Sequence, residues 1–319
     1  MATLNEHRKT ENNGQSLLAS FLLTCSMSLM TYSLSAEEPS KKISNESVFM
    51  DKLLEAEIIE LNFIWDATSP LLPLNPPFLQ SLSTTHRASA GFVPGGIAFA
   101  SDVMFFSGQH GAPTIDALGH ISHEGKLFGG IDALSAESPQ GLRSGGIESY
   151  PREKLVNRGV LLDIPRYKGL ERLKPGYEIT PEDLQGTAES QGVEIMEGDS
   201  VLIRTGYGQL FMTDKAAYLG YRPGIGEASA IWLAGKNIFL SGADNLTYDV
   251  APETGSIFPA HRILVAEHGI YLVENLNLES LASTLAERKL SEFVLVINPP
   301  RFRGATAFPV NVFVMIPPG

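Results

Sequence analysis

The sequence has few basic residues, a single cysteine and none of several signature motifs, and each of these features argues against a class of function. Lys and Arg total 24 against 36 Asp and Glu, and the net charge of −12 argues against a nucleic-acid-binding surface. The glycine-rich stretch at 94–97 is not followed by Lys-Ser or Lys-Thr, so a nucleotide-binding phosphate loop is unsupported. No Gly-x-Ser-x-Gly turn is present, which argues against a serine hydrolase.

The N-terminal segment differs in composition from the rest. Residues 17–30 are apolar with small side chains, and a small-residue stretch and an acidic pair follow. This order resembles a secretory signal peptide, so we expect residues 1–36 to be removed and the protein to be exported, periplasmic or secreted; a cytoplasmic location is the alternative. Serines interrupt the apolar run, which is short for a bilayer, so we expect no stable membrane span in the mature form. Cleavage would remove Cys25, the only cysteine, and exclude disulfides and thiol catalysis.

The remaining chain alternates between helical and extended patterns. Residues 37–47 are polar and indicate a linker, and residues 48–319 show no convincing internal boundary, so we expect one domain. The spacing of apolar residues predicts helices over residues 48–61, 181–191, 226–236 and 279–289, and short strands over 62–65, 159–164, 201–204, 238–240, 293–297 and 310–316. Thr180 and Pro181 are typical of a helix start. Strands that alternate with helices predict an α/β architecture around a buried sheet.

The stretch from His110 to His120 concentrates candidate metal ligands. Three of the seven histidines, His110, His120 and His123, lie in it or just beyond it, together with Asp116. Imidazole and carboxylate groups are common ligands of zinc, manganese and iron. The glycines and the proline between them permit a tight backbone that can aim several side chains at one point. The alternative is a polar loop that carries ordinary surface histidines.

A second candidate cluster lies between residues 261 and 278. His261 follows Phe-Pro-Ala, which places it at the start of a helix or turn. Glu274 follows the apolar run 270–273, which places it at the end of a strand. Taken alone, His261 is more simply a surface residue at a helix N-terminus, and Glu274 is more simply a cap or a salt-bridge partner.

Together these segments resemble the cyclase or kynurenine formamidase-like family of metal-dependent hydrolases, to which isatin hydrolase and trans-dienelactone hydrolase look related. The family pattern H-x-G-T-H-x-D-x-P-x-H has the spacing of His110, Asp116 and His120. Further segments match family landmarks in the same order, at residues 159–164, 198–206, 242–244, 261–278 and 304–309. The resemblance covers roughly residues 60–319 and implies a mixed central sheet in a swivelling β/β/α-like fold.

The resemblance also implies a site, residue by residue. The implied ligands of a divalent metal, zinc or manganese, are His110, Asp116, His261 and Glu274. His120 would be the acid/base residue. The family's middle histidine is Thr114 in this sequence, so one imidazole ligand is missing and one ion is expected rather than two.

The implied reaction is hydrolysis of an N-formyl aryl amide, a cyclic amide or a lactone by metal-activated water. The implied partners are a small-molecule substrate and further copies of the chain, in a homodimer or homotetramer. Near the motif, four aromatic residues are candidates for a substrate wall or simply for the core: Trp65, Phe105, Phe106 and Phe128. The alternative function is a small-molecule binding protein on the same scaffold whose catalytic site has degraded, which Thr114 would explain.

Overall fold

The computed structural model describes residues 45–252 and 258–318. The chain from Glu46 onward forms one compact unit. The predicted signal peptide, residues 1–36, lies outside the described residues, as does the predicted linker up to residue 44.

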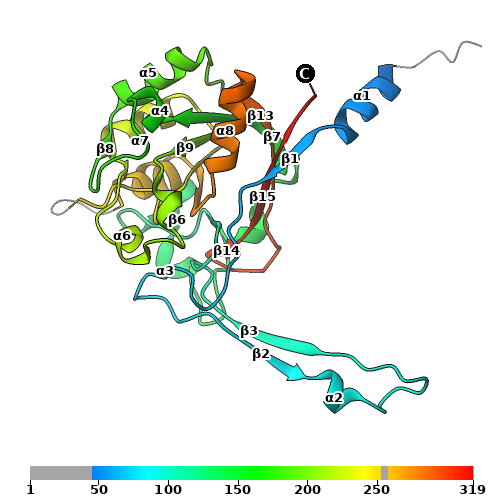
Figure 1. Ribbon diagram of the computed structural model, residues 1–319. Coiled ribbons are helices and arrows are strands. Elements are labelled where there is room, and N and C mark those ends of the chain that lie inside the picture. The colour runs from blue at the N-terminus through cyan, green and yellow to red at the C-terminus, as the bar shows by residue number, and fades with distance from the viewer. Residues whose placement is uncertain (1–44, 253–257, 319) are drawn as a thin grey trace, which may run out of the picture. The chain divides into compact units, whose positions relative to one another are not determined.

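A nine-stranded mixed sheet organises this unit, as predicted (Figure 1). In spatial order its strands are β1 (Glu57–Glu60), β15 (Asn311–Ile316), β13 (Glu292–Asn298), β7 (Val156–Asp163), β9 (Ser200–Arg204), β11 (Leu240–Ala243), β12 (Tyr271–Glu274), β4 (Thr114–Asp116) and β14 (Ala307–Pro309). The four strands from β7 to β12 run parallel to one another, and the pairs on either side of them are antiparallel. The carboxyl ends of the parallel strands therefore meet at one edge, where α/β proteins commonly bind ligands.

The sheet is curled, because consecutive strands lie at opposite ends of it. Only Val310 separates β14, at one end of the strand order, from β15, next to the other end. A flat sheet would place these strands far apart, so its two ends must approach each other. A backbone hydrogen bond joins the two ends: Phe63 N, in the segment after β1, donates to Ala112 O, in the segment before β4, over 2.9 Å.

Helices cover the sheet and explain the burial of its strands. The larger ones are α5 (Pro181–Gln191), α7 (Glu227–Gly235), the π-helix η5 (His261–Glu267) and α8 (Glu279–Arg288). Apolar residues of α5, α7 and η5 pack on one face of the parallel strands, and those of α8 pack inside the curl against β13 and β15. β9, β11 and β12 are buried throughout, whereas β13 and β15 alternate between buried and partly exposed residues because helices cover them on one face only.

The remaining helices and strands are mostly short. They are α1 (Asn45–Leu54), β2 (Leu79–Thr84), α2 (His86–Ser89), β3 (Ser101–Phe105), β5 (Lys126–Leu127), η1 (Phe128–Gly130), β6 (Ile131–Asp132), α3 (Ala133–Ala136), η2 (Ile147–Ser149), η3 (Arg152–Lys154), α4 (Ile164–Tyr167), β8 (Glu178–Ile179), η4 (Tyr207–Leu210), α6 (Lys215–Leu219) and β10 (Gly224–Ile225).

Most predicted elements are confirmed; the strand predicted over 238–240 overlaps β11 only at Leu240, and two elements near the start are wrong. The helix predicted over 48–61 ends at Leu54, and β1 follows it. Ile58 and Ile59 are β-branched, and Ile59 reaches the core only from a strand paired with β15. The strand predicted at 62–65 is an extended segment outside the sheet ladder, held by isolated bonds such as the one from Phe63 N to Ala112 O.

An antiparallel hairpin, β2–β3, extends away from the nine-stranded sheet (Figure 1). Its strands are exposed on both faces. The exposed apolar side chains of this hairpin arm, residues 79–105, are Leu79, Leu82, Phe92, Val93, Ile97, Phe99, Val103, Met104 and Phe105. A two-stranded ribbon is marginally stable by itself in water, so these residues need a covering surface.

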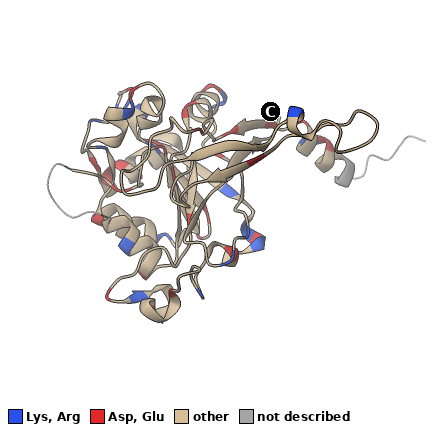
Figure 2. Cartoon of the chain, turned by 90° about the horizontal axis from the view of Figure 1, so that it is seen from below, with Lys and Arg blue, Asp and Glu red and all other residues tan. Residues whose placement is uncertain are grey.

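Charged residues show no segregation by sign. Figure 2 shows Lys and Arg interspersed with Asp and Glu, and no basic face gathers among the described residues in that view. None of the described helices combines the length and the apolar character that crossing a bilayer requires.

Candidate metal centre

Two neighbouring strands aim acidic and hydroxyl side chains at one face of the sheet. Glu274, at the end of β12, is the direct cross-strand partner of Thr114 on β4. Side chains alternate along a strand, so Thr114 and Asp116 share a face with Glu274, whereas Ile115 and Val273 between them point into the core. Because side chains alternate between the two faces of the sheet, the carboxylates of Asp116 and Glu274 lie next to each other in a buried position.

His261 connects these carboxylates to a third. The residue begins η5, and only 2% of its side chain is exposed. Its Nε2 lies 3.1 Å from Asp116 Oδ2 and 3.3 Å from Glu274 Oε1, and its Nδ1 donates a hydrogen bond to Asp249 Oδ2. The ring therefore has a carboxylate at each nitrogen.

Burial and mutual attraction shift the pKa values of this group in different directions. Burial lowers the pKa of His261, but Asp249, Asp116 and Glu274 outweigh it and hold that pKa well above its usual value. Burial raises the pKa of Asp116, but the imidazoles of His120 and His261 outweigh it and hold the pKa below its usual value. Burial raises the pKa of Glu274, and the charge on Asp116 adds to the effect. Two buried carboxylates this close need positive charge between them.

His120 approaches from the more open side. Its Nε2 lies 4.0 Å from Asp116 Oδ1, and 24% of its side chain is exposed. The side-chain amide of Gln109 lies 3.3 Å from His120 Nδ1 and donates to Thr306 Oγ1 over 2.7 Å. Because Gln109 occupies Nδ1, Nε2 is the ring nitrogen that faces the carboxylates.

His110 and Thr114 contribute buried polar atoms that have no partner in the part of the chain that the structure describes. Both ring nitrogens of His110 and the hydroxyl of Thr114 are buried without a hydrogen bond to any described residue. Burial also lowers the pKa of His110, which favours the neutral ring that binds metals. Trp65 and Phe78 hold the imidazole edge to face, with ring centroids 5.2 Å and 6.4 Å away. Unsatisfied buried groups are costly, so their presence in a packed cavity indicates a missing partner.

The residues present fit a divalent cation. Ligand atoms of Asp116, His120 and His261 lie within 4.8 Å of one another, and Glu274 contacts the same nitrogen of His261 as Asp116 does. Imidazole and carboxylate donors of this kind suit zinc or manganese. A cation would neutralise the paired carboxylates and supply a partner for the orphaned groups of His110 and Thr114.

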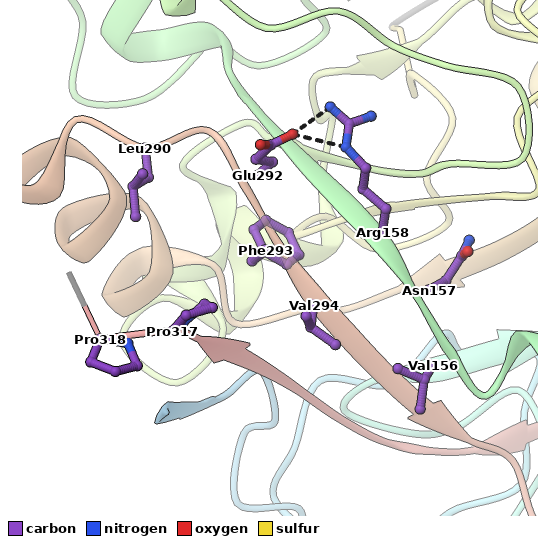
Figure 3. Close-up of a pocket in the computed structure, with 9 residues that line it drawn as sticks. All are labelled: Val156, Asn157, Arg158, Leu290, Glu292, Phe293, Val294, Pro317 and Pro318. Atoms are coloured by element: carbon purple, nitrogen blue, oxygen red, sulfur yellow. Dashed lines mark hydrogen bonds and ion pairs between the residues drawn. The ribbon is translucent and has the colours of Figure 1, made fainter. Parts of the chain in front are cut away.

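All five residues predicted for the site line one cavity of about 220 Å³: His110, Asp116, His120, His261 and Glu274. Other lining residues are apolar or neutral, including Leu72, Leu246 and Phe258. A larger groove of about 680 Å³ lies elsewhere, over β7 and β13 (Figure 3). Its charged side chains, Arg158 and Glu292, bond each other, so this groove offers no comparable set of free ligands.

The other candidates from the sequence are not among the residues that line the cavity. Trp65 packs against His110, with ring centroids 5.2 Å apart, and Phe106 packs against Trp65 at 5.0 Å, so both belong to the packing behind His110. Phe105 lies on the exposed hairpin arm, and Phe128 is also exposed, so the described residues form no aromatic wall from these four side chains. His123 pairs with Glu267 at 3.1 Å, also outside the cavity lining.

Three residues of the site were not predicted from the sequence. Gln109 contacts His120, Asp249 contacts His261, and Asn275 lines the cavity and donates to Gly111 O over 3.2 Å. Gln109 and Asn275 are next to predicted ligands in the sequence, and this was the only sequence feature that could have pointed to them. No such feature pointed to Asp249, because twelve residues separate it from His261.

Comparisons with known proteins agree with this geometry. A family model described as "Putative cyclase" matches residues 46–250, and a comparison with curated protein sequences found no match. A crystal structure described as a novel cyclase is 28% identical, with a TM-score of 0.74 over 83% of this chain and 88% of that one. Isatin hydrolase A from Labrenzia aggregata is 21% identical, with a TM-score of 0.64 over 86% and 100%. A predicted metal-dependent hydrolase from Bacillus stearothermophilus is 19% identical, with a TM-score of 0.55 over 82% and 98%. These likenesses confirm the predicted fold.

Proposed function

This chain belongs to the cyclase family, and on that premise we propose that it is a metal-dependent hydrolase of small amides or esters. The observation that carries the proposal is the buried junction of Asp116, His261 and Glu274, with Nε2 of His261 within 3.3 Å of both carboxylates. A set of donors this dense is expensive to bury without a cation. Isatin hydrolases among the similar structures support the hydrolase assignment.

The residues of the site would have different roles, which follow from their positions in the cavity. A bound divalent cation supplies Lewis acidity, which acidifies water and polarises a substrate carbonyl. Asp116, His261, Glu274 and His110 would hold it at the closed end of the cavity, where burial excludes bulk water. His120 is the more exposed imidazole there, and its Nε2 makes no hydrogen bond to any described residue. It would accept the proton of the attacking water at Nε2 and return it to the leaving nitrogen or oxygen.

The proposed substrate is a small planar amide or ester. The cavity is small, and its lining is mainly apolar apart from the polar cluster at one end. Aryl N-formyl amides, cyclic amides such as isatin, and lactones share the required shape and a carbonyl group. Among the described residues, no charged side chain other than the candidate ligands lines the cavity, which favours a neutral substrate.

The experiment that tests this function combines metal content with a substrate screen. We expect the purified protein to retain close to one equivalent of zinc or manganese by mass spectrometry and to hydrolyse at least one of the three substrate classes. Asp116→Ala should lose both the metal and the activity. Glu182→Ala, which removes an exposed carboxylate of α5, should keep both. A wild-type chain that takes up no metal on reconstitution would favour the degraded binding protein instead.

We further propose that the hairpin arm, residues 79–105, packs on a second copy of this chain. Its exposed apolar side chains lie on both faces of the ribbon, so folding against one surface of its own chain would cover only half of them. Two arms packed reciprocally would cover the exposed apolar side chains of both copies. A homodimer is the simplest assembly that satisfies both arms.

Light scattering after size exclusion tests this assembly. We expect a dimer for the wild type and a monomer for the double variant Leu82→Lys, Val103→Lys, because both residues are exposed on the arm. Leu134→Lys, at an exposed position on α3, should remain dimeric. A monomeric wild type, or a double variant that stays dimeric, would contradict the arm's role.

A further inference from the structure

The two carboxylate oxygens of Asp249 accept hydrogen bonds from different groups, one from the backbone and one from a side chain. Oδ1 accepts a hydrogen bond from Ala260 N over 2.6 Å, at the residue before η5. Oδ2 accepts from His261 Nδ1. Asp249 and His261 are 1% and 2% exposed, so water does not compete for either contact. One carboxylate therefore fixes both the start of the helix and the plane of the imidazole that follows.

This contact decides which nitrogen of His261 faces the other carboxylates. A carboxylate at Nδ1 keeps that nitrogen protonated, because an ionised carboxylate can only accept. The ring then presents Nε2, and only Nε2, to Asp116 and Glu274. Metal-binding histidines commonly have such a carboxylate at the second nitrogen, which sets the tautomer and the ring orientation.

The backbone before Asp249 is strained in a way that favours this placement. Thr247 and Tyr248 have φ values of 68° and 58°, in the left-handed region that β-branched and aromatic residues rarely adopt. Asn245 Nδ2 donates to Pro223 O over 2.6 Å and to Tyr248 O over 3.2 Å, which holds the segment in place. Tyr248 OH donates to Ser241 Oγ over 2.7 Å. Buried hydrogen bonds thus hold residues 247 and 248 in an unfavourable backbone conformation. This conformation directs the carboxylate of Asp249 at His261.

We propose that Asp249 is a positioning residue that fixes His261 with Nε2 directed at the metal; this rests on the metal-dependent function proposed above. Asp249 is not among the described residues that line the cavity, so it would act through His261. It acts on the orientation and protonation pattern of a ligand, and its loss should appear first as weaker metal binding.

The test compares Asp249→Asn with the wild type. The Asn oxygen can still accept from Ala260 N, but the amide NH₂ would then face Nδ1 and force the ring proton onto Nε2. We expect the zinc Kd of Asp249→Asn, measured by competition with a chromogenic chelator, to rise 10- to 100-fold. Asp183→Asn, which alters another buried helix-capping aspartate, is the matched control. It should lower thermal stability and leave the zinc Kd unchanged.

A second measurement uses the wild type alone and does not depend on how any variant folds. In zinc-loaded protein, ¹⁵N NMR of the histidine rings should identify Nε2 of His261 as the metal-bound nitrogen and Nδ1 as protonated. Zinc bound through Nδ1, or an unchanged zinc Kd in a folded Asp249→Asn variant, would overturn the role of Asp249. Failure of the wild type to bind zinc would instead overturn the proposed function.

Discussion

Asp116 and His261 are separated by 145 residues in the sequence, yet Oδ2 of the first lies 3.1 Å from Nε2 of the second. The contact exists because β12 carries the chain from η5 to the side of β4. Glu274 enters the same junction through the same strand pairing. The strand order thus brings the candidate ligands together, and these ligands act as a group.

Replacing His120 should separate catalysis from metal binding. We expect His120→Ala to lower kcat by 10²- to 10⁴-fold, the usual contribution of an acid/base residue, while the metal content stays unchanged. His123→Ala is the matched control, since His123 pairs with Glu267 outside the cavity lining. Loss of metal from His120→Ala would show that the closeness of His120 to Asp116 reflects a ligand role.

Thr114→Val tests the orphaned hydroxyl. The substitution keeps the shape of the side chain and removes a buried polar atom that has no partner. We expect the metal-free protein to gain about 1 kcal/mol in free energy of unfolding, because an unsatisfied polar group is no longer buried. Zinc affinity should fall several-fold, since the hydroxyl lies where the family has an imidazole. Urea titration and chelator competition measure the two effects, and an unchanged zinc Kd would show that Thr114 has no part in binding.

Zinc affinity should rise with pH. Without metal, Asp249, Asp116 and Glu274 hold the pKa of His261 well above its usual value, so the ring carries a proton on Nε2 that a metal must displace. The proton is bound below that folded-state pKa and is lost as pH rises through it. Competition titrations at about pH 6, 7.5 and 9 should therefore give a falling zinc Kd. A Kd independent of pH would show that His261 binds metal without releasing a proton.

Asp244 should make stability fall as pH rises through the acid range. The residue is fully buried, and burial raises its pKa to about 6 although hydrogen bonds from Thr205 oppose the shift. Between about pH 4 and 6 the folded state keeps a proton that the unfolded state releases, so stability is lost as pH rises. A shift from 3.8 to about 6 corresponds to roughly 3 kcal/mol.

Comparison with Asp244→Asn isolates this effect, since asparagine does not titrate. The variant should be less stable at every pH, because its NH₂ group faces the donors of Thr205 and Gly206. The advantage of the wild type in urea titrations should be larger at pH 4.5 than at pH 7. An advantage that instead grows with pH would show that the folded state favours the carboxylate.

Local signals in the sequence predicted local structure well. Thr180 accepts a hydrogen bond from Asp183 N and caps the start of α5, because capping depends on a few neighbouring residues. The same holds for His261 at a helix start and Glu274 at a strand end. The helix predicted over 48–61 was wrong in its second half, because pairing with β15 decides the conformation of 57–60 and local spacing does not show it.

The ligand set and its supporting residues differ in how predictable they were. His110, Asp116, His120, His261 and Glu274 came from the family resemblance, and all line one cavity. Their roles as ligands or acid/base stay predictions. Asp249 could not be predicted, because its function depends on two left-handed residues and on a helix start that only the fold brings to it.

The single residue between β14 and β15 has a consequence for incomplete chains. Residues 307–316 pair with β4 at one end of the sheet and lie between β1 and β13 at the other. A fragment that stops before residue 307 would leave β4 and β13 with unpaired backbone groups at once. Open strand edges are templates for intermolecular pairing, so truncated forms of this protein should aggregate from both sides.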